Sequence, residues 1–146
     1  MARSLDSWAN HTIMTSTVIY EGQLRSRCTH LQSNTTILND APVDNHGKGE
    51  TFSPTDLLAT ALGSCMLTIM GIKANNLDIE LEGSKAKITK IMGDAPRRIV
   101  QIDIEIEFPQ RWDKKTQTLL ERAATTCPVH YSLHPDIQKN IHFIWP

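Results

Sequence analysis

Residues 52–65 read FSPTDLLATALGSC and open a long apolar stretch. Ser53 can cap a helix, Pro54 suits its first position, and Asp56 completes a capping box. Side chains on the apolar stripe then follow at helical spacing, at Leu58, Leu62, Cys65, Ile69 and Ile72. Because this helix is apolar around much of its circumference, we expect it to be buried and to end at Asn76.

Strand patterns and turn residues surround this helix on both sides. Before it we expect a loose leader, a hairpin broken at a glycine, a third strand and a long loop, at residues 1–13, 17–32, 35–38 and 40–50. After it we expect three strands with alternating or branched residues, at 77–82, 85–91 and 100–108. A helix from Asp113, a short helix at 129–133 and a last strand at 141–145 complete the chain. This order predicts an α+β class, in a single domain over residues 14–146.

The composition sets limits on partners and compartment. The chain has 146 residues, 15 basic and 16 acidic, with a formal charge of −1. We therefore expect neither nucleic acid nor an anionic membrane surface as a partner. We also expect no membrane span, because no apolar stretch approaches the roughly 20 residues required. The N-terminus lacks the pattern of a secretory signal, so we expect a cytoplasmic protein.

Three cysteines need an explanation, because they are too few for a secreted disulfide framework. Cys65 lies on the apolar stripe, where a thiol is usually a small core residue. Cys127 precedes Pro128, so it would stand at the N-cap of the short helix, where a thiolate is stabilised. A simple helix kink remains an alternative for Cys127. We assign no role to Cys28.

Other polar residues have both structural and functional interpretations. Arg25 and Arg27 lie on the first hairpin, and either could stabilise a thiolate and orient a peroxide. Asp56 has a capping role, and a catalytic role is the less expected alternative. Glu50 lies in the glycine-flanked loop. A further array, at Cys127, His130 and His134, has spacing that could bind zinc, although no fourth ligand is evident.

Two segments resemble those of a known family. Residues 52–65 resemble the central-helix motif of the OsmC/Ohr family, named for osmotically inducible protein C and organic hydroperoxide resistance protein. Residues 123–130, AATTCPVH, resemble its second cysteine motif. The resemblance covers residues 15–146. It implies antiparallel sheets around a buried central helix, in an intertwined homodimer with active sites at the subunit interface.

The resemblance also implies an activity and its residues. It implies two-cysteine reduction of organic hydroperoxides, with Cys65 as peroxidatic and Cys127 as resolving cysteine. Arg25 resembles the arginine that activates the thiolate, although Arg27 is close enough to compete for that assignment. Asp56 stands one place after the position where many members have glutamate, which here is Thr55.

The remaining expectations concern binding. We expect Arg27, Glu50, Leu62 and Ile69 to contribute to a substrate site for a peroxide with an apolar tail. No metal, haem or flavin is needed. A dithiol reductant, either a small molecule or a lipoylated protein, would reduce the disulfide. The alternatives are a non-enzymatic redox sensor and a protein that binds a small apolar ligand in the dimer-interface cleft.

Overall fold

The computed structural model describes residues 13–146, so the predicted leader lies almost entirely outside the described residues. The chain divides into two compact units, the first ending at Pro54 and the second running from Thr55 to Pro146. The two units have separate sheets of three strands each. Together they form the mixed α+β architecture that the order of elements predicts.

The first unit is an antiparallel sheet with the order β1-β2-β3. Its strands are β1 (Ser16–Gly22), β2 (Arg25–His30) and β3 (Thr36–Asp40), which confirms the hairpin and the third strand. The β1–β2 turn falls at Gln23 and Leu24, whose φ angles of 55° and 62° lie in the left-handed region that such two-residue turns require. The loop after β3 contains one 3₁₀ turn, η1 (Val43–Asn45).

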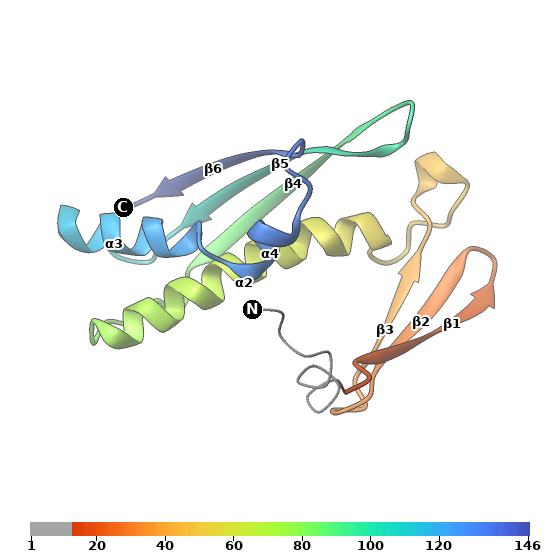
Figure 1. The fold of residues 1–146 in the computed structure, drawn as a ribbon, viewed down its shortest axis with the longest axis horizontal. Coiled ribbons are helices and arrows are strands. Elements are labelled where there is room, and N and C mark those ends of the chain that lie inside the picture. The colour runs from red at the N-terminus through yellow and green to blue at the C-terminus, as the bar shows by residue number, and fades with distance from the viewer. Residues whose placement is uncertain (1–12) are drawn as a thin grey trace, which may run out of the picture. The chain divides into compact units, whose positions relative to one another are not determined.

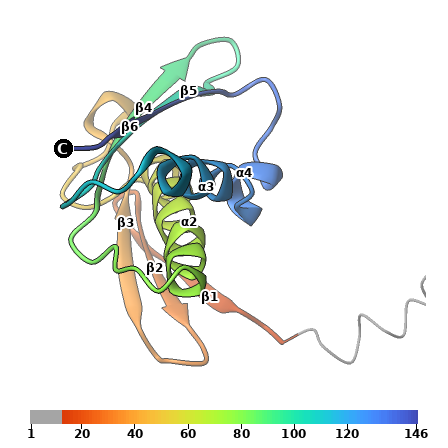
Figure 2. The ribbon, with the colours of Figure 1, turned by 90° about the vertical axis from the view of Figure 1, so that its left-hand side faces the viewer.

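The second unit has the predicted central helix and a sheet with the order β4-β5-β6. Helix α2 (Pro54–Asn76) has the predicted bounds. The strands are β4 (Lys85–Gly93), β5 (Arg98–Glu107) and β6 (Gln138–Ile144), and the other helices are α3 (Lys114–Ala124) and α4 (Pro128–Ser132). All three helices lie on the same face of this sheet (Figures 1 and 2).

The core of the second unit lies between α2 and the sheet. One face of α2 is buried, at Ala59, Leu62, Gly63, Met66, Met70 and Ala74. These side chains share a cluster with the buried isoleucines of β5, Ile102, Ile104 and Ile106. The exposed side of α2 mixes polar and apolar residues, and its Leu58 and Ile72 are 44% and 53% exposed. The chain by itself therefore buries only one face of the predicted core helix.

Two strand predictions were wrong. Residues 77–82 form turns rather than a strand, although Leu77, Ile79 and Leu81 still pack against the core. Alternating apolar residues can therefore contact the core from a turn, without a strand partner. The sheet is also not wholly antiparallel, because β6 pairs with β5 in parallel, Gln101 opposite Gln138 and Glu107 opposite Ile144. The α3–α4 connection carries the chain back across the sheet, as a parallel pair requires.

The expectation about apolar length also needs correction. An 18-residue window of α2 has a mean hydropathy of 1.6, so among the described residues this helix is long and apolar enough to cross a membrane. By itself this is a weak criterion, because the core helix of a soluble protein meets the same test. In α2, 33% of that window is buried within the chain.

Candidate active site

Cys65 lies near the middle of α2 and is partly buried. Its thiol is free, and its side chain packs against the core cluster of the second unit. The residues on either side of its position differ in environment, since Met66 is fully buried and Ser64 is exposed. Cys65 therefore stands at the boundary between the buried and the open face of the helix.

Cys127 is the N-cap of α4, as the Cys-Pro step predicts. Its backbone is extended, with φ −71° and ψ 143°, and Pro128 occupies the first turn of the helix. The His130 backbone N–H donates to the Cys127 Sγ at 3.2 Å. The side chain is 0% exposed, so this thiol is sealed from solvent while it accepts a hydrogen bond from a helix terminus.

The two sulfurs are neighbours. Burial raises the pKa of Cys127; the His130 N–H opposes that shift, and the nearby Cys65 side chain adds to it. Both cysteines are free thiols. Two free thiols that lie near one another can be joined in a disulfide after one of them is oxidised.

The first unit has an arginine that is held by two carboxylates. The Arg25 Nε and Nη2 donate to the two oxygens of Asp40 at 2.6 and 2.7 Å, and Nη2 also donates to Glu50 at 2.9 Å. Asp40 is only 1% exposed and accepts the Glu50 backbone N–H at 3.1 Å. The bond to Arg25 lowers the pKa of Asp40, while the bonds to Asp40 and then Glu50 raise the pKa of Arg25. The guanidinium is thus fixed in a bidentate geometry.

Arg27 is in a different environment. Its Nε donates to Glu21 at 3.2 Å, and its side chain is 42% exposed. A single contact to a half-exposed carboxylate fixes a guanidinium less firmly than a bidentate, buried one. The two hairpin arginines are therefore not equivalent, although they are only two residues apart.

The other residues predicted on α2, Asp56, Leu62 and Ile69, are engaged in contacts within the second unit. Asp56 pairs with Lys90 at 2.9 Å, and Lys90 also donates to the Thr55 hydroxyl at 2.9 Å. The first turn of α2 is thereby tied to β4. Leu62 is 0% exposed and belongs to the core, so it cannot touch a substrate in this conformation, whereas Ile69 is half-buried beside the core.

The zinc array does not assemble. Within residues 13–146 no group of three His, Cys, Asp or Glu side chains is arranged to hold a metal ion. His134 is instead 3.7 Å from Asp136. Cys28 accepts a hydrogen bond from the Asn39 side-chain amide at 3.2 Å, within the first sheet.

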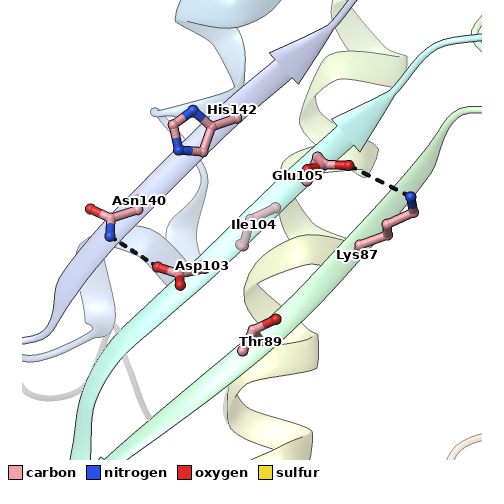
Figure 3. Close-up of a pocket in the computed structure, with 7 residues that line it drawn as sticks. All are labelled: Lys87, Thr89, Asp103, Ile104, Glu105, Asn140 and His142. Atoms are coloured by element: carbon pink, nitrogen blue, oxygen red, sulfur yellow. Dashed lines mark hydrogen bonds and ion pairs between the residues drawn. The ribbon is translucent and has the colours of Figure 1, made fainter.

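A polar hollow of about 370 Å³ lies on the sheet of the second unit and is lined by Lys87, Thr89, Asp103, Ile104, Glu105, Asn140 and His142 (Figure 3). Charged groups that line it form ion pairs or hydrogen bonds with neighbouring side chains. Lys87 is 3.6 Å from Glu105, and Asn140 donates to Asp103 at 2.9 Å. Neither cysteine of the pair lines this hollow.

Three residues of these sites were missed from the sequence. Asp40 could have been found, because the β2–β3 hairpin places it directly opposite Arg25. Lys90 carries no local signal, since its contact with Asp56 joins two elements that are far apart in sequence. His130 was considered only as a metal ligand, and its backbone contact with Cys127 follows from the cap geometry.

Comparisons with known proteins agree with this architecture. The family model described as OsmC-like protein matches residues 47–142. A candidate osmotic stress induced and detoxification response protein from Psychrobacter arcticus 273-4 is 52% identical, with 92% of this chain and 98% of that chain covered and a TM-score of 0.89. No curated protein matches the sequence.

Two more distant structures share the fold. The organic hydroperoxide resistance protein OsmC of Legionella pneumophila is 14% identical, with 90% of this chain and 98% of that chain covered and a TM-score of 0.71. The organic hydroperoxide resistance protein OhrB of Bacillus subtilis is 16% identical, with 91% and 100% covered and a TM-score of 0.66. The family-model match and the relative of 52% identity show that the chain belongs to the OsmC-like protein family.

Proposed function

We propose that this protein reduces organic hydroperoxides with Cys65 and Cys127 as its redox pair. The observation that carries the proposal is the contact between a partly buried thiol on α2 and a sealed thiol at the N-cap of α4. Two relatives in fold are named organic hydroperoxide resistance proteins, which supports the same class of substrate.

In the first step the Cys65 thiolate attacks the distal oxygen of the peroxide. A sulfur–oxygen bond forms, the oxygen–oxygen bond breaks, and the alcohol leaves after taking up a proton. Cys65 becomes a sulfenic acid. Its partial exposure suits the approach of a peroxide, whereas the 0% exposure of Cys127 does not.

In the second step Cys127 attacks the Cys65 sulfenic acid. The disulfide forms and water leaves, so Cys65 is protected from further oxidation. A dithiol reductant, either a small molecule or a lipoylated protein, then restores both thiols by exchange. Its two electrons balance those that the peroxide accepts.

Arg25 is the residue that we assign to the Cys65 thiolate, by the family resemblance. A guanidinium held bidentately by Asp40 keeps one orientation, and such preorganised charge favours an anionic nucleophile. Glu50 is the more exposed of the two partners, since its side chain is 61% exposed. Arg27 and Asp56 take lesser parts in this proposal, since each is engaged elsewhere in its own unit.

We also propose that the protein works as a cytoplasmic homodimer. Helix α2 has an exposed face that carries two large apolar side chains, Leu58 and Ile72, which are 44% and 53% exposed. A second copy packed on this face would bury it. Sedimentation equilibrium should give twice the chain mass, and Ile72→Glu should shift the protein toward monomer.

The activity is tested by oxidising the reduced protein with cumene hydroperoxide or hydrogen peroxide and mapping disulfides by mass spectrometry. We expect a Cys65–Cys127 link, faster consumption of the organic peroxide, and loss of consumption in Cys65→Ser. Cys28→Ser is the matched control and should behave like wild type. Full consumption by Cys65→Ser, with no link in wild type, would refute the proposal. A link that forms but turns over slowly would indicate a redox sensor, and a co-purifying apolar compound with no link would indicate a ligand-binding protein.

A further inference from the structure

His130 has a buried ring nitrogen that the redox chemistry described above does not use. Its Nδ1 is shielded from solvent and finds no hydrogen-bond partner within residues 13–146. Buried polar atoms are nearly always paired, so an unpaired one calls for an explanation. The ring is also positioned by an edge-on contact with Tyr131, with ring centres 5.9 Å apart.

This nitrogen is close to the resolving cysteine. The backbone nitrogen of His130 is 3.2 Å from the Cys127 Sγ. Standard covalent geometry keeps the Nδ1 of a histidine within roughly 4 Å of its own backbone nitrogen. The His130 Nδ1 therefore lies within roughly 7 Å of the sulfur, a gap that a chain of one or two water molecules can bridge.

The protonation states of His130 and Cys127 suit a transfer of the thiol proton to the imidazole. Burial, and then the charge of Lys139 on β6, lower the pKa of His130, so the imidazole is neutral at neutral pH. With its proton on Nε2, the ring presents a lone pair at Nδ1. Burial raises the pKa of Cys127, so this cysteine is a thiol when it must act as a nucleophile. The thiol needs a base, and the titratable groups identified around this pair are Lys139, Cys65 and His130.

We propose that His130 accepts the Cys127 thiol proton through bridging water as the Cys65–Cys127 disulfide closes. The step rests on the proposed function, since it begins from the Cys65 sulfenic acid. The Cys127 sulfur forms the new S–S bond, and the S–O bond of Cys65 breaks. The proton held by His130 passes to the departing hydroxide, which leaves as water. No oxidant is needed beyond the peroxide that made the sulfenic acid.

The test separates disulfide closure from the peroxide step. His130→Phe keeps an aromatic ring beside Tyr131 and keeps the backbone N–H to Cys127, but it removes the basic nitrogen. His130→Asn is the second variant, in case the first does not fold. His134→Phe is the matched control, because His134 is an exposed histidine four residues later. Closure is followed in single turnover by acid quench and mass spectrometry, and the peroxide step by peroxide consumption.

At pH 7 we expect closure to be at least ten-fold slower in both His130 variants, because general-base catalysis typically contributes 10²–10⁴-fold. The peroxide step should stay within about two-fold of wild type. The difference should shrink as pH rises, because hydroxide then removes the Cys127 thiol proton without help from His130. Peroxide should also drive more Cys65 to sulfinic acid in the variants.

Two results would overturn the inference. One is a closure rate in His130→Phe equal to that of wild type and of His134→Phe. The other is a slowing of the same size at every pH, which would show a purely structural effect. A wild-type protein that forms no Cys65 sulfenic acid would instead refute the proposed function, so the two failures are distinguishable.

Discussion

Gly63 lets α2 approach β4 closely, and Gly63→Ala tests how tightly that approach is set. A Cβ at position 63 would lie 2.4 Å from the Ile88 Cδ1, 3.4 Å from its Cγ1 and 3.6 Å from the Ala86 Cβ. Atoms essentially never approach as closely as the first distance, so either Ile88 must change rotamer or the helix must move away from the sheet.

The magnitude follows from two opposing effects. Overpacking a core by one methyl typically costs about 1–3 kcal/mol. Replacing glycine by alanine inside a helix returns about 1 kcal/mol through helix propensity. We therefore expect Gly63→Ala to lower the free energy of unfolding by about 0–2 kcal/mol. Ile88→Val removes the clashing Cδ1 and costs about 0.5–1.5 kcal/mol by itself.

The assay is urea denaturation of the reduced protein at one fixed concentration, since dimerisation would add a dependence on concentration. In the Ile88→Val background, Gly63→Ala should become neutral or stabilising. Ser64→Ala is the control, because Ser64 is exposed and the change only shortens its side chain. It should raise stability by no more than about 0.5 kcal/mol.

A Gly63→Ala protein more stable than wild type would refute this reasoning, as would an equal loss with Ile88 and with Val at position 88. The reasoning also has a functional consequence, because Cys65 follows Gly63 by two residues on the same helix. If α2 moves away from the sheet, the Cys65–Cys127 contact changes, so disulfide closure should slow in Gly63→Ala and recover in the double variant.

Three further predictions concern pH and capping. The folded-state pKa of Asp40 is lowered, chiefly by Arg25, so its stabilisation is present above the ordinary value of 3.8 and is lost as pH falls. Between pH 7 and 3 the melting temperature of Asp40→Asn should therefore fall less than that of wild type. At pH 7 the melting temperature of the variant should be the lower of the two. The folded-state pKa of Cys127 is raised by burial, so its contribution is complete below the ordinary value of 9.0 and declines at higher pH. Urea midpoints between pH 7 and 10 should decline more for the reduced wild type than for Cys127→Ala. Asp113 caps α3 by accepting the Thr116 N–H at 3.0 Å, so Asp113→Ala should lower the melting temperature by a few degrees and Asp113→Asn by less, as circular dichroism can measure.

Local chemistry explains the parts of the fold that could be predicted. The start of α2 at Pro54 and the cap at Cys127 depend on residues within a few positions of one another. The hairpin of β1 and β2 was predicted for the same reason, although its turn lies at Gln23 and Leu24 rather than at the preceding glycine. Signals of this kind survive in any tertiary setting.

The failures arise where a local pattern has two tertiary solutions. Alternation at 77–82 suits a strand, but these residues contact the core from turns. The pattern of the last strand does not carry its direction, and β6 is parallel to β5 because of the route taken by α3 and α4. An apolar helix likewise does not reveal which of its faces the chain covers by itself.

In the candidate site, too, local features could be predicted from the sequence and long-range contacts could not. The sequence alone determined the two cysteine positions, the helix that carries Cys65 and the cap that holds Cys127, because capping and helical periodicity act over short distances. Only the tertiary structure decided that these two thiols are in contact, that Arg25 rather than Arg27 is held by a buried carboxylate, and that Asp56 is engaged by Lys90. Those pairings join elements that are distant in sequence, and they depend on strand register and on the packing of α2 against its sheet.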